Sequence, residues 1–210
     1  MQDFLWPPLA LLLLWLIWAL RQRPWQDWQD NTLQHLVLGG CVLSGSLWML
    51  QAHANGPQPL HLIGAALLVQ MVGPALASLM LLLVLLATSS LHGVPPIQWP
   101  WLALSLVLLP VLLSWGWHRL LQKVAPPNLF VYLLGSGFAG GALSHAAAGL
   151  ALHAGLVEWP AQGLPPSLPF WWLLSWGEAF ETGFLLTLMV VYRPRWVRLF
   201  DDRRYLHPST

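Results

Sequence analysis

Residues 61–90 read HLIGAALLVQMVGPALASLMLLLVLLATSS, thirty residues without a single Asp, Glu, Lys or Arg. As one helix this run would be longer than the ~30 Å hydrocarbon core of a bilayer, so it would have to tilt strongly. Alternatively it breaks at Gly73-Pro74 into two halves of about 15 residues, each rising only ~22 Å. A broken or re-entrant hairpin at 61–90 would explain both the unbroken apolar run and the short rise of each half, provided that it is buried among other helices.

The rest of the chain is equally apolar. Of its 210 residues 57% are hydrophobic and 8% are charged, whereas a soluble domain carries roughly 25% charged residues. The other long apolar runs are 4–20, 33–50, 99–117, 128–152 and 169–192. The sequence therefore predicts an all-α, polytopic helical membrane protein with six to seven membrane segments. We expect a single transmembrane domain over 1–192, followed by a basic tail over 193–210. The first run has no preceding Arg or Lys and no cleavage site after it, so we expect a retained helix rather than a signal peptide.

The basic residues decide between one and two crossings of 61–90. There are nine of them: Arg21, Arg23, Arg119, Lys123, Arg193, Arg195, Arg198, Arg203 and Arg204. One crossing would divide them seven to two across the membrane, whereas two crossings place all nine on one side. The positive-inside rule favours the second arrangement. We therefore expect a bacterial inner membrane protein with its N-terminus outside and its C-terminal tail in the cytoplasm. The outer face then carries four histidines: His53, His61, His92 and His153.

Several classes of function are excluded by what the sequence lacks. It contains no GxxxxGK[ST] phosphate loop and no GxSxG nucleophile motif, and it leaves no room for a soluble ATPase domain. No basic stripe or nucleic-acid module is present. The glycines at 135, 137, 140 and 141 resemble a dinucleotide fingerprint, but no strand precedes them, so they indicate close packing of membrane helices. Cys41 has no intrachain partner. We expect a non-enzymatic membrane protein.

Ionisable residues inside the apolar runs are the first functional candidates. Glu178 and Glu181 share one face of the last helix, at i and i+3. Counted along the helices, His145 lies at a similar depth, so these side chains could meet. Two interpretations remain open: a cation or proton site, or a protonated glutamate bonded to Thr182 or to a neighbouring helix. The tryptophans at run ends are expected to anchor in the headgroup region; they are Trp6, Trp25, Trp28, Trp99, Trp101, Trp159, Trp171, Trp172 and Trp196.

The outer histidines are the second group of candidates. Imidazole binds divalent transition metals, but His53 and His61 match no stock zinc spacing, and HExxH and paired CxxC motifs are absent. Each loop histidine taken alone is more readily explained as a solvated polar residue. Four of them on one face without Lys or Arg weaken that explanation, and both a metal site and solvated histidines remain open.

Several stretches resemble a known family. The segment from His61-Leu-Ile-Gly64 to Val72-Gly-Pro74, and the Leu91-His-Gly93 that follows, are similar to the membrane substrate-binding subunits of cobalt and nickel energy-coupling-factor transporters. Gly177-Glu-Ala-Phe-Glu-Thr-Gly183, together with Val190 to Val197 and Phe200 to Leu206, looks like a proteobacterial branch described as energy-coupling-factor transporter permeases. Leu33-Gln-His35 and Asn128 to Tyr132 fit that branch too. The resemblance covers most of the chain.

The resemblance implies a ligand set that this chain matches only in part. In that family the metal is held by the N-terminal amine, a histidine at position two and the histidine of the His-x-x-Gly motif. Only the last carries over, onto His61, because position two is Gln2. The family's Gly-Ala-Asn turn is also absent. His53, His92 or His153 would then have to supply the missing ligands.

From these observations we expect a substrate-capture subunit for a divalent transition metal. Nickel or cobalt would be the substrate, with zinc or copper as further possibilities. His61 would be the primary ligand, His53 and His92 its helpers, and Glu178, Glu181 and His145 deeper candidates on the path. The implied partners are membrane lipid, a membrane coupling protein and cytoplasmic ATPase subunits. Since neutral imidazole is required, binding should weaken below about pH 6.

Two rival functions are open at this stage. One is a non-transporting structural or assembly subunit of a larger membrane complex, which the departures from the metal motif favour. The other is a haem protein that uses His145 and His35. Those two histidines fall toward opposite faces of the predicted topology, which argues against a shared haem.

Overall fold

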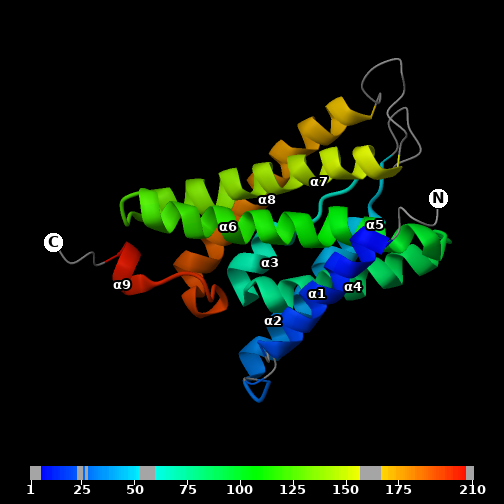
Figure 1. Cartoon of the computed structure of the whole chain (residues 1–210). Coiled ribbons are helices and arrows are strands. Elements are labelled where there is room, and N and C mark those ends of the chain that lie inside the picture. Colours follow the sequence, from blue (N-terminus) through cyan, green and yellow to red (C-terminus); the bar gives the residue numbers. More distant parts are fainter. Residues whose placement is uncertain (1–5, 23–25, 27, 53–59, 157–166, 207–210) are drawn as a thin grey trace.

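The computed structural model describes residues 6–22, 26, 28–52, 60–156 and 167–206, and this part of the chain is almost entirely helical. The first four helices are α1 (Trp6–Arg21), α2 (Asn31–Met49), α3 (Ala65–Val72) and α4 (Pro74–Leu91). A continuous rod follows, made of η2 (Pro96–Gln98), α5 (Trp99–Leu102), the π-helical η3 (Ala103–Leu108) and α6 (Leu109–Val124). The last elements are the π-helical η4 (Val131–Ala139), α7 (Gly140–Leu156), α8 (Leu168–Tyr192), η5 (Pro194–Trp196) and α9 (Asp202–Tyr205). The predicted all-α fold is confirmed (Figure 1).

The break predicted at Gly73-Pro74 separates α3 from α4. Gly73 has φ 85°, a conformation that side chains larger than glycine rarely adopt. Pro74 begins α4, where its missing N–H is tolerated. All eight residues of α3 are buried, and at 1.5 Å per residue the helix is about 12 Å long, too short to cross a bilayer. Residues 61–90 are therefore a short buried helix followed by a longer one, not one over-long helix.

Three helices among the described residues are long and apolar enough to cross a membrane: α4, the rod Pro96–Val124 and α8. The shorter α1 is also apolar. The rod continues seven residues past the end expected from hydropathy, through Arg119 and Lys123. Its last turns are amphipathic, because His118 is buried while both basic side chains are exposed. The polar residues therefore do not terminate the helix.

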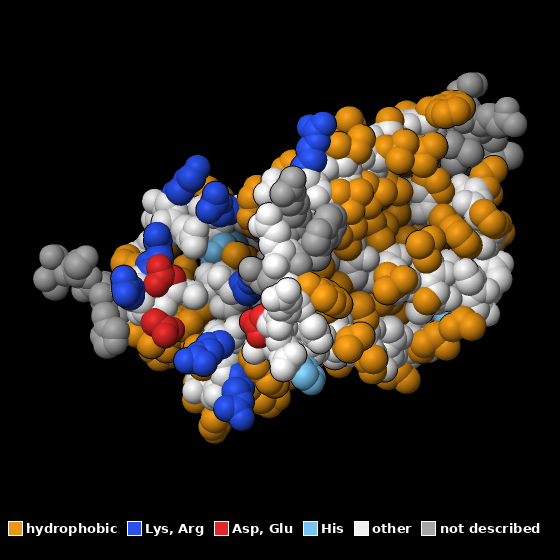
Figure 2. Space-filling model, turned by 90° about the horizontal axis from the view of Figure 1, so that it is seen from below, with side chains coloured by type: hydrophobic (Ala, Val, Ile, Leu, Met, Phe, Trp, Pro, Cys, Tyr) orange, Lys and Arg blue, Asp and Glu red, His pale blue; other side chains and the backbone are white. Residues whose placement is uncertain are grey.

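Most basic side chains gather at the end of the molecule that carries the C-terminal tail (Figure 2). The tail lies against the end of α6, where the Arg204 guanidinium donates to the Gln122 carbonyl. The end of α1 lies at the same region, since Trp18 and Arg119 both contact the Trp115 ring. We call this the basic end. The described residues on the other side of the bundle, 51–52, 60–64, 91–99, 153–156 and 167–168, include no Lys or Arg.

Small residues let α7 and η4 approach α8 closely. A Cβ at Gly141 would lie 3.1 Å from the Glu178 carbonyl oxygen, and one at Gly137 would lie 2.9 Å from the Leu186 side chain. These contacts confirm the interpretation of the glycine pattern as helix packing. They also bring α7 and α8 together over α3, where the candidate site lies.

Candidate metal-binding loop

Residues Leu60–Gly64, which we call the histidine loop, lead into α3. Three side chains from three different helices hold the backbone of this loop. The Glu178 carboxylate of α8 accepts hydrogen bonds from the N–H groups of Ile63 (2.8 Å) and Gly64 (2.7 Å). The Trp48 indole of α2 donates to the Ile63 carbonyl at 3.1 Å, and His145 Nε2 of α7 lies 3.2 Å from the His61 carbonyl oxygen. The loop is thereby fixed by α2, α7 and α8 together.

Gly64 is required at the point where the loop becomes a helix. Its φ is 74°, in the left-handed region, and a Cβ there would lie 3.3 Å from the Ser44 hydroxyl. Its N–H is one of the amide groups that no carbonyl within α3 can satisfy. The Glu178 carboxylate caps that end and is also favoured by the positive end of the helix dipole. The His-x-x-Gly spacing therefore places His61 three residues before Gly64, the N-cap residue of α3.

The imidazole of His61 is packed between two buried indoles. Its ring centroid lies 4.8 Å from that of Trp48 and 6.1 Å from that of Trp171. Nδ1 lies 3.1 Å from the Leu62 carbonyl oxygen, so the Nδ1 proton is donated there and the Nε2 lone pair is left for a ligand. Burial is the main cause that lowers the pKa of His61, to about 4, and the neighbouring His92 lowers it further. His61 is therefore neutral over the physiological range.

A groove of about 410 Å³ lies beside His61, between the end of α2 and the first half of α8. Its remaining lining is apolar and includes Leu47, Leu62 and Phe170. His61 is the one ionisable residue among the residues that line it. A polar ligand in this groove would have a single strong anchor, the imidazole.

Two of the three deeper candidates, His145 and Glu178, are hydrogen-bonded to the backbone of the same loop. His145 is fully buried and directs Nε2 to the His61 carbonyl, and its Nδ1 has no hydrogen-bond partner among the described residues. Both oxygens of Glu178 accept backbone amides, so Glu178 is bonded to the loop and not to Thr182. Glu181 differs: its two carboxylate oxygens are buried and lack a partner among the described residues.

The other histidines are dispersed. His92 ends α4, with Nδ1 2.8 Å from the Thr88 carbonyl oxygen, and it lies close enough to influence the pKa of His61. His153 is buried and bonded to the Gly149 carbonyl and the Ser167 hydroxyl. His53 lies outside the described residues. Within the part of the chain that the structure describes, no three His, Cys, Asp or Glu side chains come together as a metal-binding group.

The haem hypothesis finds no support in the placement of its two histidines. His35 is exposed in the first turn of α2 and bonded to the Asn31 carbonyl. His145 contacts the histidine loop, next to Trp48 at the opposite end of α2.

Trp48 and Trp171 are the site residues that sequence reasoning missed. Trp171 was expected at the headgroup level, and this expectation is wrong: it is 1% exposed and contacts His61, His145 and His153. Trp171 and Trp172 are adjacent in the sequence, but successive helix residues point in different directions, and Trp172 is 61% exposed. Gly149 makes room for the buried indole, since a Cβ there would lie 3.0 Å from it.

Comparisons with known proteins agree with this architecture. The family model for the cobalt uptake substrate-specific transmembrane region matches residues 3–196. Two solved structures, a transition metal transporter and a truncated transition metal transporter, superpose with a TM-score of 0.73 at 20% sequence identity. Each match covers 91% of this chain. It covers 89% of the transition metal transporter and 95% of the truncated one. No curated protein sequence matches the chain significantly.

Proposed function

Because the chain belongs to the family of cobalt uptake substrate-specific transmembrane regions, we propose that it captures a divalent transition-metal ion at the membrane, with His61 as the primary ligand. Cobalt or nickel is the proposed substrate; zinc and copper share the same preference for imidazole. The observation that carries the proposal is the histidine loop, in which three helices hold a neutral imidazole beside a groove, with no hydrogen bond from its Nε2 to any residue that the structure describes.

One imidazole does not complete a transition-metal site, so further ligands are needed. His53 is the first candidate, because it follows Ala52 directly and Ala52 pairs with Leu60, the residue before His61. His92 is the second, because it lies within the range of electrostatic interaction with His61. Glu181 is proposed as a later contact deeper in the bundle, since its carboxylate has no other partner among the described residues. Glu178 and His145 serve as positioning residues.

Transport would need energy from another protein, since the chain carries no phosphate loop. We propose that a coupling protein in the membrane and a cytoplasmic ATPase supply it, and that the basic end faces the cytoplasm, as the positive-inside rule favours. The histidine loop would then receive metal from the outer side.

Metal content of the gently purified protein, measured by mass spectrometry, tests the proposal. Wild type should carry near-stoichiometric cobalt, nickel, zinc or copper, and His61→Ala should lose it. His35→Ala is the matched control, because it also removes a histidine but at an exposed position at the far end of α2. Wild-type protein that takes up none of the four metals after supplementation would refute metal capture. Co-purification with a complex that lacks any transporter ATPase would then favour a structural or assembly subunit.

A further inference from the structure

α3 is held at both of its ends by other parts of the chain. At its start, Glu178 accepts the Ile63 and Gly64 amides. At its end, the carbonyls of the last turn lack partners within the helix, and the C-terminal tail supplies them. The Leu199 N–H donates to the Gln70 carbonyl and the Arg198 N–H donates to the Met71 carbonyl, both at 3.2 Å. The C-terminal tail comprises residues 193–206, which follow α8.

The tail begins where α8 is forced to end. Arg193 precedes Pro194, which disfavours a helical backbone for it, and its φ is −145°. The chain then turns through η5 and passes across the basic end of the bundle from α8 to α6 (Figure 1). Asp201 starts the single turn of α9 by accepting the Arg203 and Arg204 amides.

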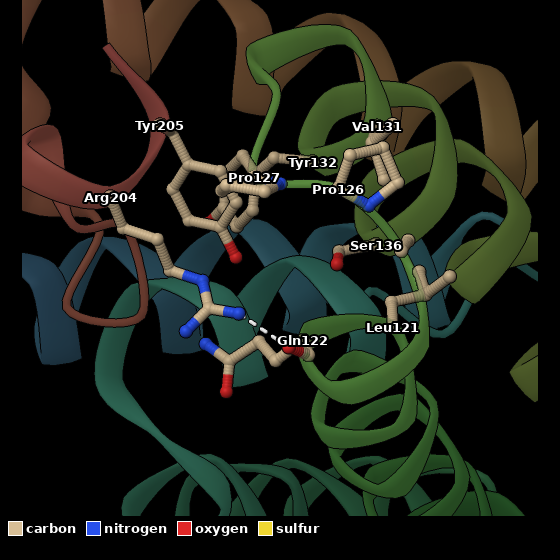
Figure 3. A pocket seen from close by; sticks show the side chains of 10 residues that line it. Leu121, Gln122, Pro126, Pro127, Val131, Tyr132, Ser136, Arg204 and Tyr205 are labelled. Carbon is tan, nitrogen blue, oxygen red and sulfur yellow. Dashed lines mark hydrogen bonds between the residues drawn. The ribbon is translucent and has the colours of Figure 1, made fainter. Parts of the chain in front are cut away.

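Aromatic rings fasten the tail to the bundle. Tyr132 of η4 lies 5.1 Å from Phe200 and 4.8 Å from Tyr205, measured between ring centroids, and the two tail rings stack at 5.6 Å. The Tyr132 hydroxyl donates to Gln70 Oε1 at 3.0 Å, so the same ring that receives the tail also contacts α3. Figure 3 shows Tyr205 and Arg204 facing Tyr132 and Gln122.

The outer surface of the tail is charged with both signs. Arg193, Arg195, Asp201, Asp202 and Arg203 are exposed, whereas Val197 and Tyr205 are buried. The order of the tail therefore comes from its inner contacts with α3, η4 and α6.

We propose that the C-terminal tail is a positioning element for His61 and acts through α3. A helix about 12 Å long with all eight residues buried has no free volume in which to bend, because protein interiors are close-packed. A shift of its last turn is therefore carried to the histidine loop at its first turn. The inference rests on the proposed role of His61 as a ligand. Coupling between two sites is reciprocal, so metal at His61 must also tighten the tail.

The first test detaches the tail by Phe200→Ala with Tyr205→Ala in the full-length protein. Co²⁺ affinity should fall about tenfold, within the usual range of couplings between sites. The conservative pair Phe200→Tyr with Tyr205→Phe keeps both rings and should restore wild-type affinity. Arg195→Ala with Arg203→Ala changes only exposed side chains of the tail and is the matched control. Detached tails with wild-type Co²⁺ affinity would overturn the proposal.

The second test reads the coupling at the tail itself, by hydrogen exchange of peptides that cover residues 195–206. Co²⁺ should slow exchange of the Arg198 and Leu199 amides in wild type. Without metal, Glu178→Ala should speed exchange of the same amides, because α3 is released at its other end. Should wild type bind none of Co²⁺, Ni²⁺, Zn²⁺ and Cu²⁺, the proposed function fails, but this metal-free comparison still decides the coupling. If the Arg198 and Leu199 amides exchange equally fast in wild type and in Glu178→Ala without metal, the proposed coupling is refuted.

Discussion

Glu178 and Glu181 are two buried carboxylates one turn apart on α8, and the structure predicts opposite results when each is truncated. Glu178 accepts two buried backbone amides, those of Ile63 and Gly64. A buried donor left without a partner costs about 1–3 kcal/mol, so Glu178→Ala should destabilise the protein by about 2–6 kcal/mol. Glu178→Gln keeps one acceptor oxygen but turns an NH₂ group toward the loop amides, and should lose about half as much.

Glu181 supplies the matched control. Its carboxylate oxygens are buried without a partner among the described residues, and a buried polar group in that state is a cost rather than a gain. Glu181→Ala should therefore leave stability unchanged or raise it.

Thermal unfolding of the two purified variants in the same detergent is the assay. Glu178→Ala should unfold at a clearly lower temperature than wild type, and Glu181→Ala should not. Equal losses from both substitutions would show that removing any carboxylate from this face of α8 is harmful. The assignment of Glu178 as the cap of α3 would then be wrong.

Four further outcomes are expected. Gly64→Ala should cost about 1–2 kcal/mol from the left-handed backbone alone, seen as a lower unfolding temperature. Gly39→Ala, on an open face of α2, should be neutral or stabilising. Gly141→Ala should destabilise more than Gly39→Ala, because its Cβ would meet the Glu178 carbonyl oxygen at 3.1 Å; equal unfolding temperatures would contradict the close packing. The lowered pKa of His61, about 4, favours neutral imidazole, so proton competition at His61 begins only as the pH falls toward that value. Metal retention should therefore hold from pH 7 to about pH 5, which revises the limit of about pH 6 expected from the sequence; loss centred near pH 6 would mean that other imidazoles carry the affinity.

The sequence predicts those features that depend on local chemistry. The break at Gly73-Pro74 follows from a residue that lacks an amide proton next to one without a side chain. The helix contacts at Gly137 and Gly141 follow from the spacing of small residues. The gathering of basic residues at one end follows from the positive-inside rule. None of these needs knowledge of a distant contact.

The features that sequence reasoning missed depend on contacts between distant residues. Glu178 lies 115 positions from Ile63, whose amide it accepts, and nothing in the spacing of Glu178 and Glu181 tells which of them will face α3. Trp171 and Trp172 are neighbours with the same propensity, yet only one points into the bundle. In the sequence the tail is recognised only by its basic residues, and its bonds to α3 arise from backbone amides that carry no sequence signal.

The way the histidine loop is held bears on the ligand that Gln2 does not supply. Trp48, His145 and Glu178 all contact the loop, but each is bonded to the loop backbone through an indole N–H, an imidazole nitrogen or a carboxylate. These three residues therefore hold the backbone that carries His61. They add no ligand of their own to the proposed metal site. A loop held in this way can keep its shape when a ligand elsewhere is replaced, because Trp48, His145 and Glu178 bond directly to its backbone. On the proposed function, the glutamine at position two would change which segment completes the site, and with it the affinity and choice of metal, without requiring any change in how α3 is held.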